Sequence, residues 1–302
     1  MNLRALGILE VIVSGVCFGF LGYFGRLAYG QGIAPGELLS LRFLISATVL
    51  LVVFGFKFLL TREWGLRLSW REILDCLGLG IFGYAVFSSC FFFALQFISA
   101  SLTVLLLYLY PCFVALAAHT FLGERLALRD VYALVLSTLG LVFVVGSEFQ
   151  VTSGVGIALG LGSAVVYAAY ILYSRKALQK TSAWASVFYI QIGAGVVLAL
   201  LNFHTPLRPV EIVSQSWPLL LLMAIVATLI AMALFLSALA KLTSTEVSIL
   251  SNTEPLTGLV VAALLMGERL SPLQYLGGLL VLAGLCLLAL KKKPVLDKAD
   301  SV

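Results

Sequence analysis

Charged residues are scarce in this chain of 302 residues. They make up 11% of the sequence, against 62% hydrophobic residues, and the mean hydropathy is +1.11. A soluble domain carries about 25% charged residues because its surface must stay hydrated. So few charges imply that lipid surrounds the chain. No charge at all occurs between Cys76 and Gly123, a run that fits two membrane helices because one helix needs about 20 residues to cross.

The chain also lacks the motifs of common enzymes and pumps. It has no GxxxxGK[ST] loop for ATP hydrolysis, and no HExxH or GxSxG sequence. Its cysteines have no CxxC or Cys/His spacing, which is typical of small buried hydrophobes and not of a metal site. They are Cys17, Cys76, Cys90, Cys112 and Cys286. We therefore expect neither an enzyme nor a bound cofactor or metal.

The remaining sequence consists of apolar runs that predict an all-α integral membrane protein. The runs are continuous and do not alternate with a period of two, which favours helices over a membrane barrel. The first run contains Glu10 and lacks a cleavage site, so we interpret it as a span and not as a signal peptide. The ten predicted spans are residues 5–28, 36–59, 73–95, 100–120, 128–146, 154–174, 183–203, 217–239, 244–266 and 272–290.

Basic residues gather on one set of connections between these spans. With the N-terminus in the cytoplasm, the cytoplasmic side holds 15 of the 19: Arg4, Lys57, Arg62, Arg67, Arg71, Arg125, Arg129, Arg175, Lys176, Lys180, Lys241, Lys291, Lys292, Lys293 and Lys298. The opposite side holds Arg26, Arg208 and Arg269, and Arg42 lies within a span. This positive-inside bias predicts two cytoplasmic termini in the cytoplasmic (inner) membrane. It accounts for the net charge of +5 without a nucleic-acid partner.

The second half of the chain resembles the first. Residues 94–126 align with residues 238–270 at an offset of 144, without a gap. The alignment pairs Pro111 with Pro255 and Gly123-Glu124-Arg125-Leu126 with Gly267-Glu268-Arg269-Leu270, and an offset of 149 pairs Ser14 with Ser163 and Arg26 with Arg175. Each unit, residues 1–149 and residues 150–302, holds five spans, and an odd number predicts that the second unit is inverted. Inverted repeats are typical of secondary transporters with a site near the midplane, although a larger bundle or a channel can also contain repeats.

The same residues resemble a known family. The repeated Gly-Glu-Arg-Leu block, the Tyr110-Pro111 and Glu254-Pro255 steps and the segments 18–22 and 37–43 are similar to the EamA branch of the drug/metabolite transporter superfamily. The resemblance covers essentially the whole chain. It implies a ten-helix bundle with a central cavity formed by the first four helices of each repeat, and peripheral fifth and tenth helices. It implies transport of small solutes, often by export.

Ionisable residues inside spans are the first candidates for the site, because each costs about 2.5–3.5 kcal/mol to insert. Glu10 and Glu246 lie near predicted cytoplasmic ends and can simply reach water. Arg42 and Glu254 lie deeper. They either face a cavity or form an interhelical ion pair. Proton coupling through Glu10 or Glu254 is a further hypothesis, since burial favours a neutral carboxyl group.

The fourth and ninth spans are candidates because each contains a proline. Pro255 removes a backbone donor and leaves a carbonyl near Ser251 to be satisfied by side chains, water or a ligand. Pro111 predicts an equivalent helix break. Both prolines can equally serve as fixed kinks. Aromatic stripes on the third and sixth spans are either packing surfaces or the wall of a site for an amphipathic solute.

These features predict a secondary transporter that exports a small polar or amphipathic metabolite, foremost an amino acid or a relative, by alternating access. An importer or exchanger of a nucleoside-like metabolite or vitamin is the alternative, and a channel or intramembrane enzyme is more remote. Protons or a counter-substrate as coupling partners, and a monomer or homodimer, stay open. The predicted substrate-binding residues are Arg42, Tyr84, Ser88, Tyr108, Tyr110, Ser163, Tyr167, Tyr170, Ser251, Asn252 and Glu254.

Overall fold

The computed structural model describes residues 2–146, 151–201 and 209–290. Within these ranges, ten helical segments are long and apolar enough to cross a membrane, so the predicted ten-span helical fold is confirmed. They are Leu3–Gly30, Pro35–Thr61, Trp70–Ala94, Ala100–Phe121, Leu128–Val145, Gly154–Ala177, Ala183–Leu201, Gln215–Leu239, Ser244–Leu265 and Pro272–Ala289. The predicted cytoplasmic lysines Lys291, Lys292, Lys293 and Lys298, and Arg208 on the opposite side, lie outside the described residues.

Five spans are single helices, and the others are divided. The single ones are α3 (Pro35–Thr61), α8 (Leu128–Val145), α9 (Gly154–Ala177), α10 (Ala183–Leu201) and α15 (Pro272–Ala289). The first span is α1 (Leu3–Gly19) and α2 (Leu21–Gly30), the fourth is α6 (Ala100–Leu107) and α7 (Tyr110–Phe121), and the ninth is α13 (Ser244–Leu250) and α14 (Thr253–Leu265). The third span is α4 (Trp70–Gly78), η1 (Leu79–Ala85) and α5 (Val86–Ala94), and the eighth is α11 (Pro209–Ala224), η2 (Ile225–Ile230) and α12 (Ala231–Leu239).

The breaks in the fourth and ninth spans lie at equivalent positions, as the two prolines predict. Pro111 and Pro255 each stand in the first turn of the helix that follows the break, where a missing N–H is not needed. The Ser251 carbonyl accepts a hydrogen bond from the Glu254 N–H at 2.9 Å. The expectation that side chains, water or a ligand must satisfy this carbonyl is therefore wrong, because the chain tightens locally and supplies its own donor.

The third and eighth spans contain π-helical segments that the sequence analysis did not anticipate. Both η1 and η2 lie in the middle of their spans, with α-helix on either side. Such wider turns are uncommon and are often found at functional sites. In this protein, η1 carries Tyr84, which lines a cavity inside the bundle.

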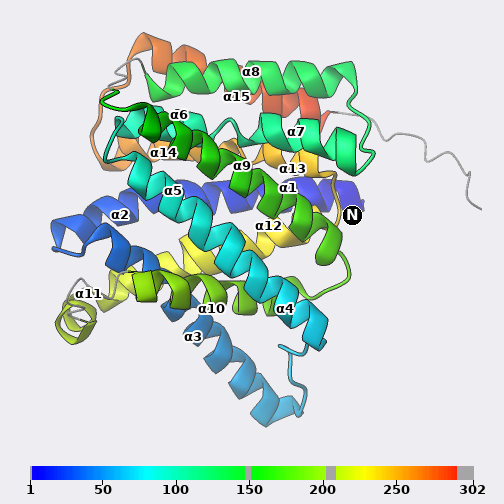
Figure 1. Ribbon diagram of the computed structural model, residues 1–302, viewed down its shortest axis with the longest axis vertical. Coiled ribbons are helices and arrows are strands. Elements are labelled where there is room, and N and C mark those ends of the chain that lie inside the picture. The colour runs from blue at the N-terminus through cyan, green and yellow to red at the C-terminus, as the bar shows by residue number, and fades with distance from the viewer. Residues whose placement is uncertain (1, 147–150, 202–208, 291–302) are drawn as a thin grey trace, which may run out of the picture.

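Glycines let the helices pack closely. In Figure 1, α8 and α15 run side by side at one edge of the bundle. A Cβ atom on Gly140 would lie only 2.6 Å from the Gly277 carbonyl oxygen between them. Deeper in the bundle, a Cβ atom on Gly19 would lie 2.4 Å from the Thr257 Cβ. Gly15 and Gly19, four residues apart, thus let α1 lie against α14.

The two ends of the bundle can be told apart by the chain termini. Arg4 donates hydrogen bonds to the carbonyls of Leu288 and Ala289, at 3.1 and 3.4 Å. The beginning of α1 and the end of α15 thus lie together, and we call this side the termini end. Because the chain crosses once per span, the connections after the first, third, fifth, seventh and ninth spans lie at the opposite end.

Candidate functional site

A cavity of about 750 Å³ lies inside the bundle. Residues of the first six spans and of the eighth and ninth line it. Tyr29, Pro35, Leu95, Ala100 and Val145 are among them, and all five flank connections at the opposite end. The cavity therefore extends from the interior of the bundle toward the opposite end.

Two opposite charges face this cavity, Arg42 on α3 and Glu254 at the start of α14. Arg42 is 6% exposed, and its guanidinium carbon lies 4.6 Å from the centre of the Phe43 ring. Arg42 and Glu254 lie close enough to interact electrostatically, but in the described part of the chain they form no direct ion pair. The Arg42 Nε also has no hydrogen-bond partner among the described residues. Both groups therefore keep capacity to bind a ligand.

The position of Glu254 follows from its surroundings. A Cβ atom on Gly19 would lie 2.8 Å from the Glu254 carbonyl oxygen, so only glycine lets α1 approach this turn so closely. The helix break leaves Glu254 in the first turn of α14, where the helix dipole stabilises a negative charge. Tyr108, at the equivalent break of the fourth span, lines the same cavity and lies close enough to interact electrostatically with the carboxylate. The two breaks thus meet at the same cavity.

An aromatic wall adjoins these charges. The Tyr84 and Phe87 ring centres are 4.9 Å apart, and Phe87 lies 4.8 Å from Tyr167 on α9. The Tyr167 ring is 4.7 Å from that of Tyr110, which lies 6.3 Å from the Tyr108 ring. Their ring planes are tilted or edge-on, which suits the quadrupoles of aromatic rings. The wall combines apolar faces with hydroxyl groups, the composition expected of a site for an amphipathic solute.

The cavity contains most, but not all, of the predicted substrate-binding residues. Those on its lining are Arg42, Tyr84, Ser88, Tyr108, Tyr110, Tyr167 and Glu254, together with Pro255. Those outside the lining are Ser163, Tyr170, Ser251 and Asn252, together with Pro111. The Ser163 and Ser251 hydroxyls instead donate to carbonyls of their own helices, at 2.6 and 2.8 Å. Each of these two hydroxyls is thus occupied by a hydrogen bond to the preceding helical turn.

Sequence reasoning missed several lining residues, including Tyr29, Phe18 and Phe87. They occur in apolar runs where nothing distinguishes a cavity-facing aromatic residue from a lipid-facing one. Tyr29 also lies at the end of a span, where aromatic belts are common. Helical spacing alone gives one signal for Phe87, which lies three residues after Tyr84 and therefore on the same face.

The other two predicted ionisable residues lie at the termini end and are paired. Glu10 accepts hydrogen bonds from Lys241 at 2.8 and 2.9 Å and from the Ser237 hydroxyl at 3.0 Å. Glu246 forms an ion pair with Arg4 at 3.2 Å. Neither carboxylate lines the cavity. Their charges connect helices of the first and second halves of the chain at the termini end.

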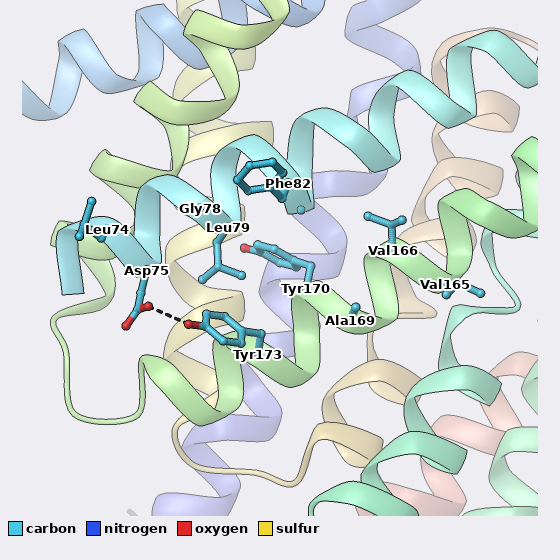
Figure 2. Close-up of a pocket in the computed structure, with 11 residues that line it drawn as sticks. Leu74, Asp75, Gly78, Leu79, Phe82, Val165, Val166, Ala169, Tyr170 and Tyr173 are labelled. Atoms are coloured by element: carbon cyan, nitrogen blue, oxygen red, sulfur yellow. Dashed lines mark hydrogen bonds between the residues drawn. The ribbon is translucent and has the colours of Figure 1, made fainter. Parts of the chain in front are cut away.

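A second, smaller recess of about 460 Å³ lies between the α4–η1 segment and α9 (Figure 2). The Asp75 carboxylate at its edge accepts a hydrogen bond from the Tyr173 hydroxyl at 2.7 Å. Phe82 on its rim is 73% exposed, which places the recess on the lipid-facing surface. Tyr170 separates this recess from the aromatic wall, since its ring centre lies 5.4 Å from that of Tyr84. The central cavity, with its two opposite charges, is the better candidate site.

The sequence matches a known protein family over most of its length. The profile of the EamA-like transporter family matches residues 5–146 and again residues 154–290. The chain belongs to the EamA-like transporter family. The predicted family is thereby confirmed, and this membership indicates a multi-pass membrane transporter and not an enzyme.

Relatives of this EamA-like transporter include proteins of known cargo. An uncharacterized transporter of Archaeoglobus fulgidus is 28% identical over 92% of this chain and 94% of its own length. The threonine/homoserine exporter RhtA of Escherichia coli is 27% identical over 80% of this chain and 77% of its own length. The pseudopaline exporter CntI of Pseudomonas aeruginosa is 26% identical over 76% and 77%. Exporters thus occur among the relatives of this EamA-like transporter.

A solved crystal structure has the same fold. It aligns with a TM-score of 0.79 over 93% of this chain and 95% of the other, at 18% sequence identity. At this identity the likeness extends to the fold alone.

Proposed function

We propose that this protein is a secondary transporter that exports a small zwitterionic metabolite, an amino acid or a related compound, by alternating access. The observation that carries the proposal is the pair Arg42 and Glu254, two opposite charges on one cavity without a direct bond between them. A buried charge needs a partner. A substrate with a carboxylate and an ammonium group supplies one to each.

Arg42 suits the carboxylate because a guanidinium group binds it with two parallel hydrogen bonds. Glu254, with Tyr108 beside it, suits the ammonium group. The aromatic wall then contacts the side chain of the substrate. The cavity volume of about 750 Å³ leaves room for a metabolite larger than the smallest amino acids.

Export as the direction is supported by the names of two relatives, a threonine/homoserine exporter and a pseudopaline exporter. With the termini end assigned to the cytoplasm by the positive-inside bias, the cavity faces outward. This is the state from which an exporter releases its substrate.

A nucleoside-like metabolite or vitamin is the second candidate substrate class. The aromatic wall of Tyr84, Phe87, Tyr110 and Tyr167 favours it, because planar heterocycles stack on such rings. A nucleoside-like metabolite or vitamin that carries charges of its own could bind Arg42 and Glu254 just as an amino acid does.

A flux assay with purified protein in liposomes tests the proposal. Liposomes are loaded with labelled L-threonine, L-phenylalanine or uridine, and efflux is measured against protein-free liposomes. We expect saturable efflux of an amino acid that an unlabelled amino acid inhibits. Saturable efflux of uridine alone would show that the substrate is a nucleoside-like metabolite and not an amino acid. Ion conductance without saturation in planar bilayers would identify a channel.

Proton coupling through Glu254 is tested in the same liposomes with an imposed pH gradient. We expect the gradient to accelerate flux in the wild type and to have no effect in the Glu254→Gln variant, which cannot exchange a proton at this position. Flux that ignores the gradient in both proteins would leave facilitated diffusion or exchange as the mechanism.

A further inference from the structure

The termini end is closed by contacts between the two halves of the chain. Arg4 binds Glu246 at 3.2 Å, and Lys241 binds Glu10 at 2.8 Å. Among the described residues, the cavity lining includes residues that flank connections at the opposite end, and none that flanks a connection at the termini end. A transporter that works by alternating access must exchange this closure for one at the opposite end.

Glu124 makes the most specific of the closing contacts. It lies just after α7, and its carboxylate accepts hydrogen bonds from the backbone N–H groups of Ser244 and Thr245 at 2.9 and 3.3 Å. The Thr245 hydroxyl donates a third at 3.1 Å. Both N–H groups lie in the buried first turn of α13, where they have no acceptor within the helix and where the helix dipole also favours a negative charge. Glu124 therefore fastens the end of the fourth span to the start of the ninth.

The offset of 144 assigns an equivalent to every part of this contact. It pairs Glu124 with Glu268, and Ser244 and Thr245 with Ala100 and Ser101 at the start of α6.

The backbone agrees with this pairing. Gly123 and Gly267 have φ of 65° and 68°. The N–H groups of Glu124 and Glu268 donate to the Ala118 and Ala262 carbonyls at 3.1 and 3.2 Å.

The caps of the two target helices are also equivalent. The Thr243 hydroxyl accepts a hydrogen bond from the Glu246 N–H at 3.1 Å, and the Ser99 hydroxyl accepts one from the Leu102 N–H at 3.3 Å. Residue 99 plus 144 is residue 243, so the same cap begins α6 and α13. The chain thus contains two copies of a carboxylate and of the helix start that receives it.

The second copy is not assembled in this state. Ala100 and Ser101 line the open cavity. Glu268 instead forms an ion pair with Arg26 at 2.8 Å, and its side chain is 52% exposed. The offset of 149 pairs Arg26 with Arg175, which lies in electrostatic range of Glu124 at the closed end.

We propose that Glu124 and Glu268 are reciprocal latches of the transport cycle. When the opposite end closes, Glu268 caps the start of α6 through the Ala100 and Ser101 N–H groups and the Ser101 hydroxyl. Glu124 then releases α13, and the termini end opens. This mechanism rests on the proposed alternating access and gives the two Gly-Glu turns a role in the transport cycle.

Matched variants of the two carboxylates test the latches. Leu95 lines the cavity beside the opposite end, so a cysteine there, in a variant without native cysteines, reports whether that end is open. The purified protein in lipid nanodiscs is treated with a membrane-impermeant thiol reagent. Glu124→Gln weakens the termini-end latch, and Glu268→Gln weakens the latch of the other state.

We expect the two variants to shift the ratio of open to closed opposite ends in opposite directions, each by about tenfold, since hydrogen bonds to a charged group are the strong ones. Glu124→Gln slows labelling, Glu268→Gln speeds it, and the double variant returns toward the wild-type rate. Shifts of the same sign, or a double variant further from wild type than both single ones, would overturn the proposal.

Cross-linking supplies a second measurement. The pair Glu124→Cys and Thr245→Cys should cross-link at once. The equivalent pair Glu268→Cys and Ser101→Cys should cross-link only as the opposite end closes, and should then block labelling at position 95. If the first pair reacts and the second never does, the latch model fails. Both readouts need no substrate, so latches that behave as expected without solute flux would refute only the proposed function.

Discussion

Arg42 and Glu254 show how single residues acquire a functional role from their surroundings. Arg42 is buried but has an unpartnered Nε among the described residues, whereas Glu10 is fully engaged by Lys241 and Ser237. A charge that is already paired stabilises the bundle, and a charge that keeps hydrogen-bonding capacity at a cavity can bind a ligand. The two kinds of residue should therefore respond differently to substitution.

Replacing Arg42 should impair binding more than folding. We expect Arg42→Gln to weaken binding of a carboxylate-bearing substrate by about 10- to 100-fold, the loss of one hydrogen-bonded charge. A thermal-shift titration with L-threonine and L-phenylalanine measures this, because a ligand that binds the folded state raises its apparent stability. Arg125→Gln, at an exposed position, is the control. If the ligand-induced thermal shift of Arg42→Gln equals that of the wild type, Arg42 stabilises the bundle and does not bind the substrate.

Replacing Lys241 should impair folding more than binding. Lys241→Met leaves the half-buried Glu10 carboxylate without its cation, and we expect a loss of about 1–3 kcal/mol of stability. Thermal unfolding in detergent measures the loss. The double variant Glu10→Gln and Lys241→Met should recover most of it, since neither charge then lacks a partner. A double variant as unstable as the sum of the two singles would show that the residues act independently.

At the scale of helices, the site depends on how closely two elements approach. Glu254 reaches the cavity because α13 and α14 are separated by a break and because Gly19 lets α1 lie against that break. Any side chain at position 19 must push α14 away, and Glu254 moves with it.

We expect Gly19→Ala to lower stability by about 1–3 kcal/mol through overpacking and to reduce flux strongly. Gly55→Ala on α3, where an added Cβ meets nothing within 4 Å, should leave flux unchanged. Thermal unfolding and the liposome assay measure both effects. Full flux in Gly19→Ala would mean that the α1–α14 contact does not set the position of Glu254.

At the scale of the whole molecule, orientation decides what the cavity faces. Charge bias predicts the termini end in the cytoplasm. Gln31 lies in the exposed connection after the first span, at the opposite end, and Glu63 lies in the exposed connection after the second span, at the termini end. In intact cells, an impermeant thiol reagent should label Gln31→Cys directly and Glu63→Cys only after the membrane is permeabilised, in a variant without native cysteines. The reverse pattern would invert the membrane orientation, and the cavity would then face inward.

The sequence by itself determined the ten spans, their family and the helix breaks at Pro111 and Pro255. Each of these follows from local chemistry: a continuous apolar run must cross lipid as a helix, and a proline cannot continue one. It also predicted both charged residues on the cavity, because ionisable groups in hydrocarbon are rare, and four of its tyrosines, Tyr84, Tyr108, Tyr110 and Tyr167.

Only the tertiary structure decided which of these residues meet. It placed Arg42 and Glu254 on one cavity, brought in Tyr29 and Phe87 from ordinary apolar runs, and engaged Glu10 in an ion pair. The physical reason is that lipid-facing and cavity-facing positions have the same composition when the cavity wall is aromatic. The direction in which a side chain points depends on neighbouring helices, and no local pattern records it.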